Sequence, residues 1–249
     1  MRPSRYLAAV TLACLPWLAN AQSLTVSAAA SLTDAFKALA PSFEQAHPGI
    51  TLRLNFAASG VLLQQIDQGA PVDVFASADQ ATMDRAAAAG RIDSATRRDF
   101  VSNSLVMVEP AQGALGLKTL QDLRKPEVRR IAVGKVETVP VGRYTRQALA
   151  SAGLWDALQA KIVAADSVRQ ALDYVSRGEV EAGFVYRTDA ALLGDKLNIV
   201  LTASGHDPVS YPVALVSDSR HKPQAQAFID FLAQPQAQQV LARYGFGQP

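Results

Sequence analysis

Four short segments of the sequence place small, uncharged residues where a predicted strand ends and a predicted helix begins. They are Ala30-Ser31-Leu32, Ala58-Ser59-Gly60, Pro140-Val141-Gly142 and Asp166-Ser167-Val168. A helix begins with backbone N–H groups that have no partner within the helix, and its N-terminus carries the equivalent of about half a positive charge. Four such ends sum to about two positive charges, so together they could hold a doubly charged anion without any Lys or Arg.

A simpler interpretation of each Ser at such a junction is a helix cap. The spacing of a capping box is matched by Ser31-x-x-Asp34 and by Ser167-x-x-Gln170. For any one junction taken alone, capping is the stronger interpretation, because Ser is preferred at helix starts in proteins of every function. Ser59 differs, since Gly60 follows it and Leu62 stands at the third position, and this leaves its hydroxyl freer for a ligand.

Residues suited to enzymatic catalysis are few. The three His, which are His47, His206 and His221, stand in turn-like contexts near a Pro, and no Gly-x-Ser-x-Gly occurs. An exported hydrolase with Ser31 or Ser59 as its nucleophile is an alternative, and it would need one of these His within reach of the Ser. Neither His-x-x-x-His nor a Cys pair is present to suggest a metal site built from side chains, and the sequence suggests no cofactor.

A further polar group, the hydroxyl of Tyr186, comes at the end of the predicted strand 182–186. A Tyr at a strand end can project its hydroxyl beyond the sheet, although a Tyr packed in the core or at its rim is the commoner situation. Tyr174, Tyr211 and Tyr244 could fill the same role.

The elements that must position these residues alternate along the chain. Short β-rich runs are predicted as strands at 24–28, 51–56, 72–76, 104–109, 130–133, 161–164, 182–186, 199–201 and 213–216. Amphipathic segments predict helices that begin near Ser31, Ser59, Val141 and Ser167, followed by a helical C-terminal tail, and Pro41 should kink or split the first helix. This alternation predicts an α/β protein with mostly parallel sheets, two lobes, and a ligand cleft at the carboxyl ends of the strands.

The first 21 residues are predicted to be a secretory signal peptide. Arg2 and Arg5 precede an apolar stretch at 6–18, and Ala19-Asn20-Ala21 supplies small residues for cleavage after Ala21. An N-terminal membrane anchor is the alternative, which the shortness of the apolar stretch disfavours. The single Cys of the chain lies within this segment, so the mature protein can form neither a disulfide nor a thiolate metal site.

Charge argues against nucleic acid as a partner. The full chain has 24 Lys and Arg against 22 Asp and Glu, and removal of the signal peptide with its two Arg leaves 22 of each. A protein that binds nucleic acid needs a basic patch to neutralise phosphates, and no such cluster is present in the sequence.

Five motifs spread along the chain make a familiar set. They are Val-Ser-Ala-Ala-Ala-Ser-Leu-Thr at 26–33, Phe-Ala-Ala-Ser-Gly at 56–60, Gly-Ala-Pro-Val-Asp-Val-Phe-Ala-Ser-Ala-Asp at 69–79, Asn-Ser-Leu-Val at 103–106 and Arg-Tyr-Gly-Phe at 243–246. With these motifs, residues 23–247 closely resemble the periplasmic molybdate-binding proteins of ABC transporters, in order and without large insertions. The resemblance implies a type II periplasmic binding protein fold, in which two α/β lobes joined by a hinge hold a tetrahedral oxyanion in the cleft between them.

The resemblance also implies a ligand set and a role. Molybdate or tungstate would be held, with its molybdenum or tungsten kept as the oxyanion, by the hydroxyls of Ser31, Ser59 and Tyr186 and the backbone N–H groups of Val141 and Val168. The protein would be a periplasmic monomer that binds its ligand tightly and delivers it to an ABC permease in the inner membrane. One lobe would contain residues 22–104 and 216–249, and the other residues 105–215.

Two alternatives share this fold. One is a binding protein for another oxyanion such as sulfate, which the set of two Ser, two N–H donors and one Tyr disfavours. The other is a periplasmic sensory module, which would share the chemistry of the site. Arg187, next to Tyr186, would weaken the case for an uncharged site if it pointed into the cleft. Alternation along the strand predicts that Arg187 points away from Tyr186.

Overall fold

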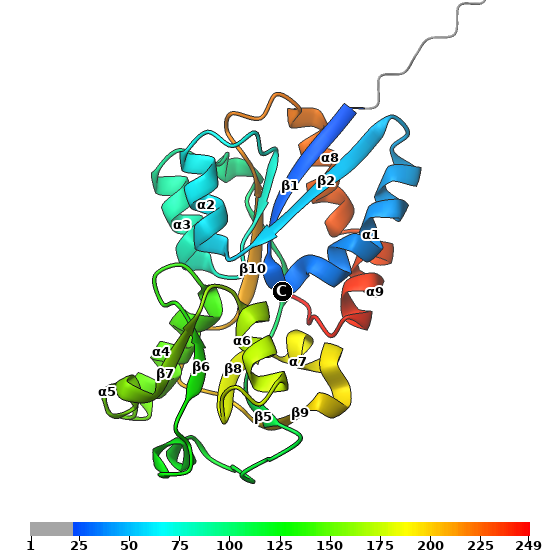
Figure 1. Ribbon diagram of the computed structural model, residues 1–249. Coiled ribbons are helices and arrows are strands. Elements are labelled where there is room, and N and C mark those ends of the chain that lie inside the picture. Colours follow the sequence, from blue (N-terminus) through cyan, green and yellow to red (C-terminus); the bar gives the residue numbers. More distant parts are fainter. Residues whose placement is uncertain (1–21) are drawn as a thin grey trace, which may run out of the picture.

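The computed structural model describes residues 22–249, and the expected signal peptide at 1–21 lies outside the described residues. The described chain forms two units, each built around a five-stranded sheet covered by helices (Figure 1). We call the unit that holds the first sheet lobe 1 and the other lobe 2. The predicted α/β class with two lobes is confirmed.

The two sheets share one plan. Lobe 1 has the strand order β2 (Ile50–Ala57), β1 (Gln22–Ala29), β3 (Val74–Ala76), β10 (Ser210–Leu215) and β4 (Arg98–Ser102). Lobe 2 has the order β7 (Ile162–Ala165), β6 (Ile131–Gly134), β8 (Ala182–Tyr186), β5 (Leu105–Pro110) and β9 (Leu197–Thr202). In each sheet the first three strands of this order pair in parallel. The fourth strand, β10 or β5, pairs antiparallel with both of its neighbours.

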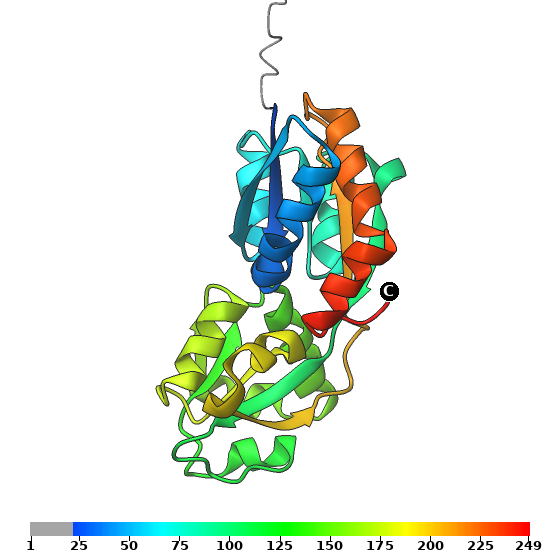
Figure 2. The ribbon, with the colours of Figure 1, turned by 90° about the vertical axis from the view of Figure 1, so that its right-hand side faces the viewer.

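The chain crosses between the lobes twice, from β4 to β5 and from β9 to β10 (Figure 2). Each reversed strand is the first one after a crossing, because the chain then enters the sheet from the side at which the parallel strands end. The expected lobe division at 215/216 is wrong by one strand, since β10 lies in the first sheet and the return crossing precedes Ser210. The apolar pattern of β10 would suit either sheet, and only its pairing with β3 and β4 decides between them.

Helices cover both faces of each sheet and connect its strands. Lobe 1 contains α1 (Thr33–Ala46), α2 (Ser59–Asp67), α3 (Gln80–Ala88), α8 (Lys222–Leu232) and α9 (Pro235–Arg243). Lobe 2 contains α4 (Pro140–Ser151), α5 (Trp155–Leu158), α6 (Val168–Ser176) and α7 (Arg187–Leu193). Short 3-10 turns are η1 (Ala30–Leu32), η2 (Ser94–Thr96), η3 (Leu120–Arg124), η4 (Gln159–Lys161) and η5 (Gly194–Lys196). Among residues 22–249, no helix combines the length and the apolar character that a membrane span needs.

Each of the nine predicted strands overlaps an observed one, but β4 was not predicted. Only Phe100 and Val101 of β4 are buried, and the strand begins with Arg98 and Asp99, so it lacks the apolar run of a central strand. The expected split at Pro41 is also absent, because α1 continues through it. Pro41 lies on the exposed face of α1, where the carbonyl that loses its helical hydrogen bond can face water.

Aromatic side chains pack α8 against α1. The rings of Phe43 and Phe228 meet edge to face with centroids 5.1 Å apart, and Phe231 contacts Phe43 in the same way at 5.4 Å. This packing returns the end of the chain to lobe 1, so that the described C-terminus lies beside the junction of the lobes (Figure 1). The carboxyl ends of the parallel strands in both sheets lead into the helices that face this junction.

Candidate functional site

The strand–helix junctions of both lobes meet at one small cavity. Its walls are Ala29, Ala30, Ser31, Ala58, Ser59 and Ala78 from lobe 1 and Val139, Pro140, Val141, Val168 and Tyr186 from lobe 2. The structure therefore brings together all five residues of the expected ligand set. The cavity measures about 10 Å³, which is close to the space that one water molecule requires. The two lobes are thus closed around the cavity. A tetrahedral oxyanion has five atoms, so it could enter the cavity only after the lobes separate.

Ser31 does not cap a helix. It is the central residue of η1, which has no side-chain cap, and its Oγ lies 2.9 Å from Oη of Tyr211. Both side chains are buried. The capping-box interpretation of Ser31 is therefore wrong, because the hydroxyl is engaged by a strand 180 residues away in the sequence rather than by its own helix.

Ser59 is the first residue of α2 and is fully buried. Its Oγ accepts a hydrogen bond from the backbone N–H of Ala78 at 3.0 Å. A hydroxyl has one hydrogen to donate, and this bond uses only an oxygen lone pair, so the Ser59 hydrogen is left for a ligand. Ala78 belongs to the Ser-Ala-Asp segment at 77–79, so this motif supplies the backbone N–H that holds the Ser59 hydroxyl.

The helix starts of lobe 2 supply backbone N–H groups. In α4 the first residue is Pro140, which has no N–H, and the N–H of Gly142 bonds to Val139 O at 2.9 Å. The N–H of Val141 between them has no partner within its helix. In α6, Ser167 is the cap and accepts from the N–H of Gln170 at 3.1 Å. Capping is therefore confirmed for Ser167, and Val168 contributes the first helical N–H.

Tyr186 is the last residue of β8, and its side chain is 1% exposed. Its hydroxyl donates to the carbonyl oxygen of Ala78 in the opposite lobe at 3.4 Å, which is a long hydrogen bond that a better acceptor could replace. Burial raises the pKa of Tyr186 well above its ordinary value, so the hydroxyl keeps its proton. It is therefore a hydrogen-bond donor at neutral pH.

Of the described residues that line the cavity, none carries a charged side chain. Two Arg lie nearby, but both are paired with carboxylates. Arg143 of α4 bonds to Asp79, and Arg169 of α6 bonds to Asp34 and Asp189. The positive character of the cavity therefore comes from helix starts and hydroxyl hydrogens, an arrangement that suits an anion without protons.

Arg187 points away from the cavity, as predicted, but for a different reason. The strand ends at Tyr186, and Arg187 is already the first residue of α7. Its exposed guanidinium donates to Thr202 Oγ1 of β9 at 2.5 Å. The start of a helix, and not alternation along a strand, turns it outward.

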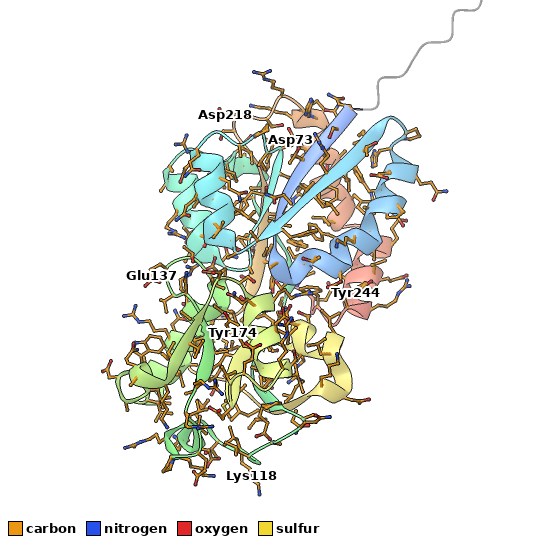
Figure 3. The ribbon with its side chains drawn as sticks, in the orientation of Figure 1. Asp73, Lys118, Glu137, Tyr174, Asp218 and Tyr244 are labelled. Carbon is orange, nitrogen blue, oxygen red and sulfur yellow. The ribbon has the colours of Figure 1, made fainter. Side chains whose placement is uncertain are left out.

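The other candidate residues lie elsewhere. Tyr174 and Tyr244 are half-buried and do not line the cavity (Figure 3). None of the three His lines it either, and His221 instead contacts Asp73, which Figure 3 places at the end of lobe 1 remote from lobe 2. Ser31 and Ser59 therefore have no His beside them in the cavity. Within residues 22–249, no group of three His, Cys, Asp or Glu side chains is placed to hold a metal ion.

Two residues of the site were not singled out by sequence reasoning. Ala78 acts through its backbone, which composition and periodicity do not reveal. Tyr211 was considered only as a substitute for Tyr186, whereas it lies behind Ser31 and does not line the cavity. A signal for Ala78 was present in the 69–79 motif, but no pattern in the sequence connects Tyr211 to Ser31.

Known proteins resemble this chain along nearly its whole length. Residues 24–247 match the model of the bacterial extracellular solute-binding protein family. The chain is 40% identical over 234 residues to the molybdate-binding protein ModA of Escherichia coli strain K12, covering 92% of this chain and 90% of that one. The solved structure of the Azotobacter vinelandii periplasmic molybdate-binding protein matches with a TM-score of 0.78 at 25% identity, over 91% of this chain and 99% of that one.

The sulfate-binding protein SubI of Mycobacterium tuberculosis H37Rv shares the fold, with a TM-score of 0.77 at 20% identity over 90% of this chain and 86% of that one. The resemblance to molybdate-binding proteins that the motifs predicted is confirmed by the closer matches, and so is the periplasmic binding protein fold. Because the family model spans residues 24–247, this chain belongs to the bacterial extracellular solute-binding protein family and is a binding protein rather than an enzyme.

Proposed function

We propose that this protein binds molybdate, and tungstate about equally well, in the periplasm and delivers it to an ABC permease in the inner membrane. The observation that carries the proposal is the lining of the cavity, where Ser31, Ser59, Val141, Val168 and Tyr186 converge and no charged side chain is present. The 40% identity to a molybdate-binding protein supports the choice of ligand.

Hydrogen bonds alone can hold such a dianion. A hydrogen bond to a charged group contributes about 1.5 to 3 kcal/mol net, so five of them contribute roughly 8 to 15 kcal/mol. Desolvation of the ion and closure of the lobes reduce this sum, and a micromolar to nanomolar affinity corresponds to about 8 to 12 kcal/mol. The donors of the cavity are therefore sufficient for tight binding without Arg or Lys.

Phosphate is rejected by the same donors. Near neutral pH phosphate carries at least one proton, and this O–H needs an acceptor. No carboxylate lines the cavity to accept it. A buried O–H without a partner costs about 1 to 3 kcal/mol or more, which favours the fully deprotonated anion.

Size distinguishes the remaining anions. Sulfate has no proton at neutral pH, but its shorter bonds hold its oxygens farther from donors spaced for a larger ion. Tungstate matches molybdate in size and charge, so the two should compete on equal terms.

Ligand binding from both lobes provides the signal for transport. Donors from lobe 1 and lobe 2 can reach one ion only in the closed state, so the ion shifts the equilibrium toward closure by its difference in affinity for the two states. A permease that recognises the closed form would accept the loaded protein and favour release on opening. We further propose that cleavage after Ala21 releases this protein as a periplasmic monomer.

Calorimetric titration of the mature protein, residues 22–249, with molybdate tests the proposal. We expect binding of one ion per chain that persists in excess sulfate and in excess phosphate. Titration with tungstate should give a similar affinity. Heat from sulfate alone would assign the site to the smaller oxyanion, the alternative that shares this fold, and the absence of binding by any of these anions would refute the proposal.

A further inference from the structure

Behind Ser31 lies a chain of polar groups, Tyr211, Asn103 and Thr188, none of which lines the cavity. Ser31 Oγ lies 2.9 Å from Tyr211 Oη, and Asn103 Nδ2 lies 3.2 Å from the same Tyr211 oxygen. Asn103 Nδ2 also donates to Thr188 Oγ1 at 2.8 Å, and Asn103 Oδ1 accepts from the N–H of Ser104 at 2.9 Å. Asn103 lies in the first crossing between the lobes, Tyr211 in β10 of lobe 1 and Thr188 in α7 of lobe 2.

The partners of this chain favour one direction of donation, because Ser31 Oγ is the one acceptor among the hydrogen-bond partners of Tyr211. The N–H of Ser104 can bond only to the oxygen of the Asn103 amide, so the amide nitrogen faces Tyr211 and Thr188. The amide nitrogen donates and cannot accept, so the Tyr211 oxygen is an acceptor in that bond. The hydrogen of Tyr211 is then left for Ser31 Oγ, its other hydrogen-bond partner.

This direction leaves the hydrogen of Ser31 without a partner in the chain. Burial raises the pKa of Tyr211 well above its ordinary value, so Tyr211 keeps the hydrogen that it donates. The ring of Tyr211 is held by edge-to-face contacts with Phe100 at 6.5 Å and Phe246 at 5.5 Å between centroids. Ser31 itself is a cavity residue, so its remaining hydrogen is available to an ion there.

We infer that Tyr211, directed by Asn103, is a positioning residue that holds the Ser31 hydroxyl as a hydrogen-bond donor to the bound oxyanion. This inference rests on the proposed oxyanion site. Tyr211 lies outside that site and determines the direction in which the Ser31 hydroxyl donates its hydrogen. Without Tyr211, the Ser31 hydroxyl could rotate. Binding of the ion would then have to fix its orientation, and this would reduce the affinity.

A double-mutant cycle separates this role from a packing role. The substitution Tyr211→Phe removes the hydroxyl and keeps the ring, and we expect molybdate binding to weaken roughly tenfold by calorimetry. In a Ser31→Ala background the same substitution should change the affinity less than about twofold, because the group that Tyr211 positions is gone. In a Ser59→Ala background it should again cost roughly tenfold, since Ser59 bonds to Ala78 and not to Tyr211.

A thermal midpoint for each variant shows whether the fold is kept. If Tyr211→Phe does not fold, Asn103→Ala removes the donor that directs Tyr211 and should weaken binding by about threefold, again only when Ser31 is present. Unchanged affinity in these variants, or an equal loss in the Ser31→Ala background, would overturn the inference while leaving the proposed function in place. Failure of the wild-type protein to bind any tetrahedral oxyanion would overturn both.

Discussion

Arg143 of lobe 2 donates a hydrogen bond from Nε to Asp79 Oδ2 of lobe 1 at 2.6 Å, and its Nη2 lies 2.5 Å from the same oxygen in an ion pair. The side chain of Asp79 is 4% exposed. The same guanidinium donates to Thr82 of lobe 1 and to the carbonyl oxygens of Val136 and Glu137 in its own lobe. Arg143 therefore joins the lobes beside the cavity, and this contact exists only while they are closed.

Loss of Arg143 should weaken ligand binding without unfolding either lobe. Removing one partner of a buried ion pair costs about 3 to 5 kcal/mol, but Asp79 keeps its bonds from Ser77 and Thr82 and becomes hydrated when the lobes open. We therefore expect Arg143→Met to reduce molybdate affinity by about 1.5 to 3 kcal/mol, or ten- to a hundredfold by calorimetry. The thermal midpoint of the unliganded variant should change little.

The matched control is another ion pair between the lobes, from Arg169 Nη1 to Asp34 Oδ2 at 2.8 Å. The Asp34 side chain is 39% exposed, and exposed pairs contribute at most about 1 kcal/mol. Asp34→Asn should thus weaken binding less than about fivefold. A larger loss in Asp34→Asn than in Arg143→Met would contradict the greater contribution expected of the buried ion pair of Arg143.

Gly60 allows a close approach of the backbones of the two lobes. Its N–H donates to Thr138 O of lobe 2 at 2.9 Å, and a Cβ at Gly60 would lie 2.6 Å from that oxygen and 2.7 Å from Thr138 Cα. Because Gly60 lies in a helix, Gly60→Ala should stabilise α2 itself by up to about 1 kcal/mol. The added methyl group should at the same time obstruct closure of the lobes. We expect Gly60→Ala to keep or raise the thermal midpoint and to weaken molybdate binding at least tenfold.

Small-angle X-ray scattering should give a larger radius of gyration for Gly60→Ala than for the wild-type protein when molybdate is present. Gln64→Ala, at an exposed position of the same helix, adds no atom to the contact and serves as the control. Wild-type affinity in Gly60→Ala would show that the ion is bound without this approach of the lobes.

The Ser31 hydroxyl can be tested directly. Ser31→Ala removes one charge-assisted hydrogen bond, and we expect molybdate affinity to fall by about 1 to 3 kcal/mol in calorimetry. Ser42→Ala, at an exposed position of the adjacent helix α1, should leave the affinity unchanged. If the two variants bind equally well, Ser31 is not a ligand.

The buried carboxyl of Asp189 should make stability depend on pH. Burial raises its pKa from 3.8 to about 6, against the opposing effect of Arg169. As pH rises, the unfolded chain releases this proton first, so the contribution of Asp189 to the free energy of unfolding falls between about pH 4 and pH 6. Urea unfolding at several pH values should show the wild-type protein losing stability relative to Asp189→Asn across this range, and a constant difference between them would contradict the shift.

Local sequence patterns were enough to locate the helix starts of the site. Ser59, Val141 and Val168 supply donors because each stands at the start of its own helix, and a helix start is set by the few residues around it. Alternation of strands and helices likewise predicted two α/β lobes. The strand β4 escaped notice because an edge strand with two buried residues carries too little apolar signal.

Tertiary structure alone decided which of these groups act together. Ser31 is held by Tyr211 at a separation of 180 residues, and Tyr186 rather than another Tyr reaches the cavity. The sheet to which β10 belongs, and the bond from Arg143 to Asp79, depend in the same way on partners distant in sequence. Such contacts arise from the packing of whole helices and strands. The residues next to each partner in the sequence therefore do not predict them.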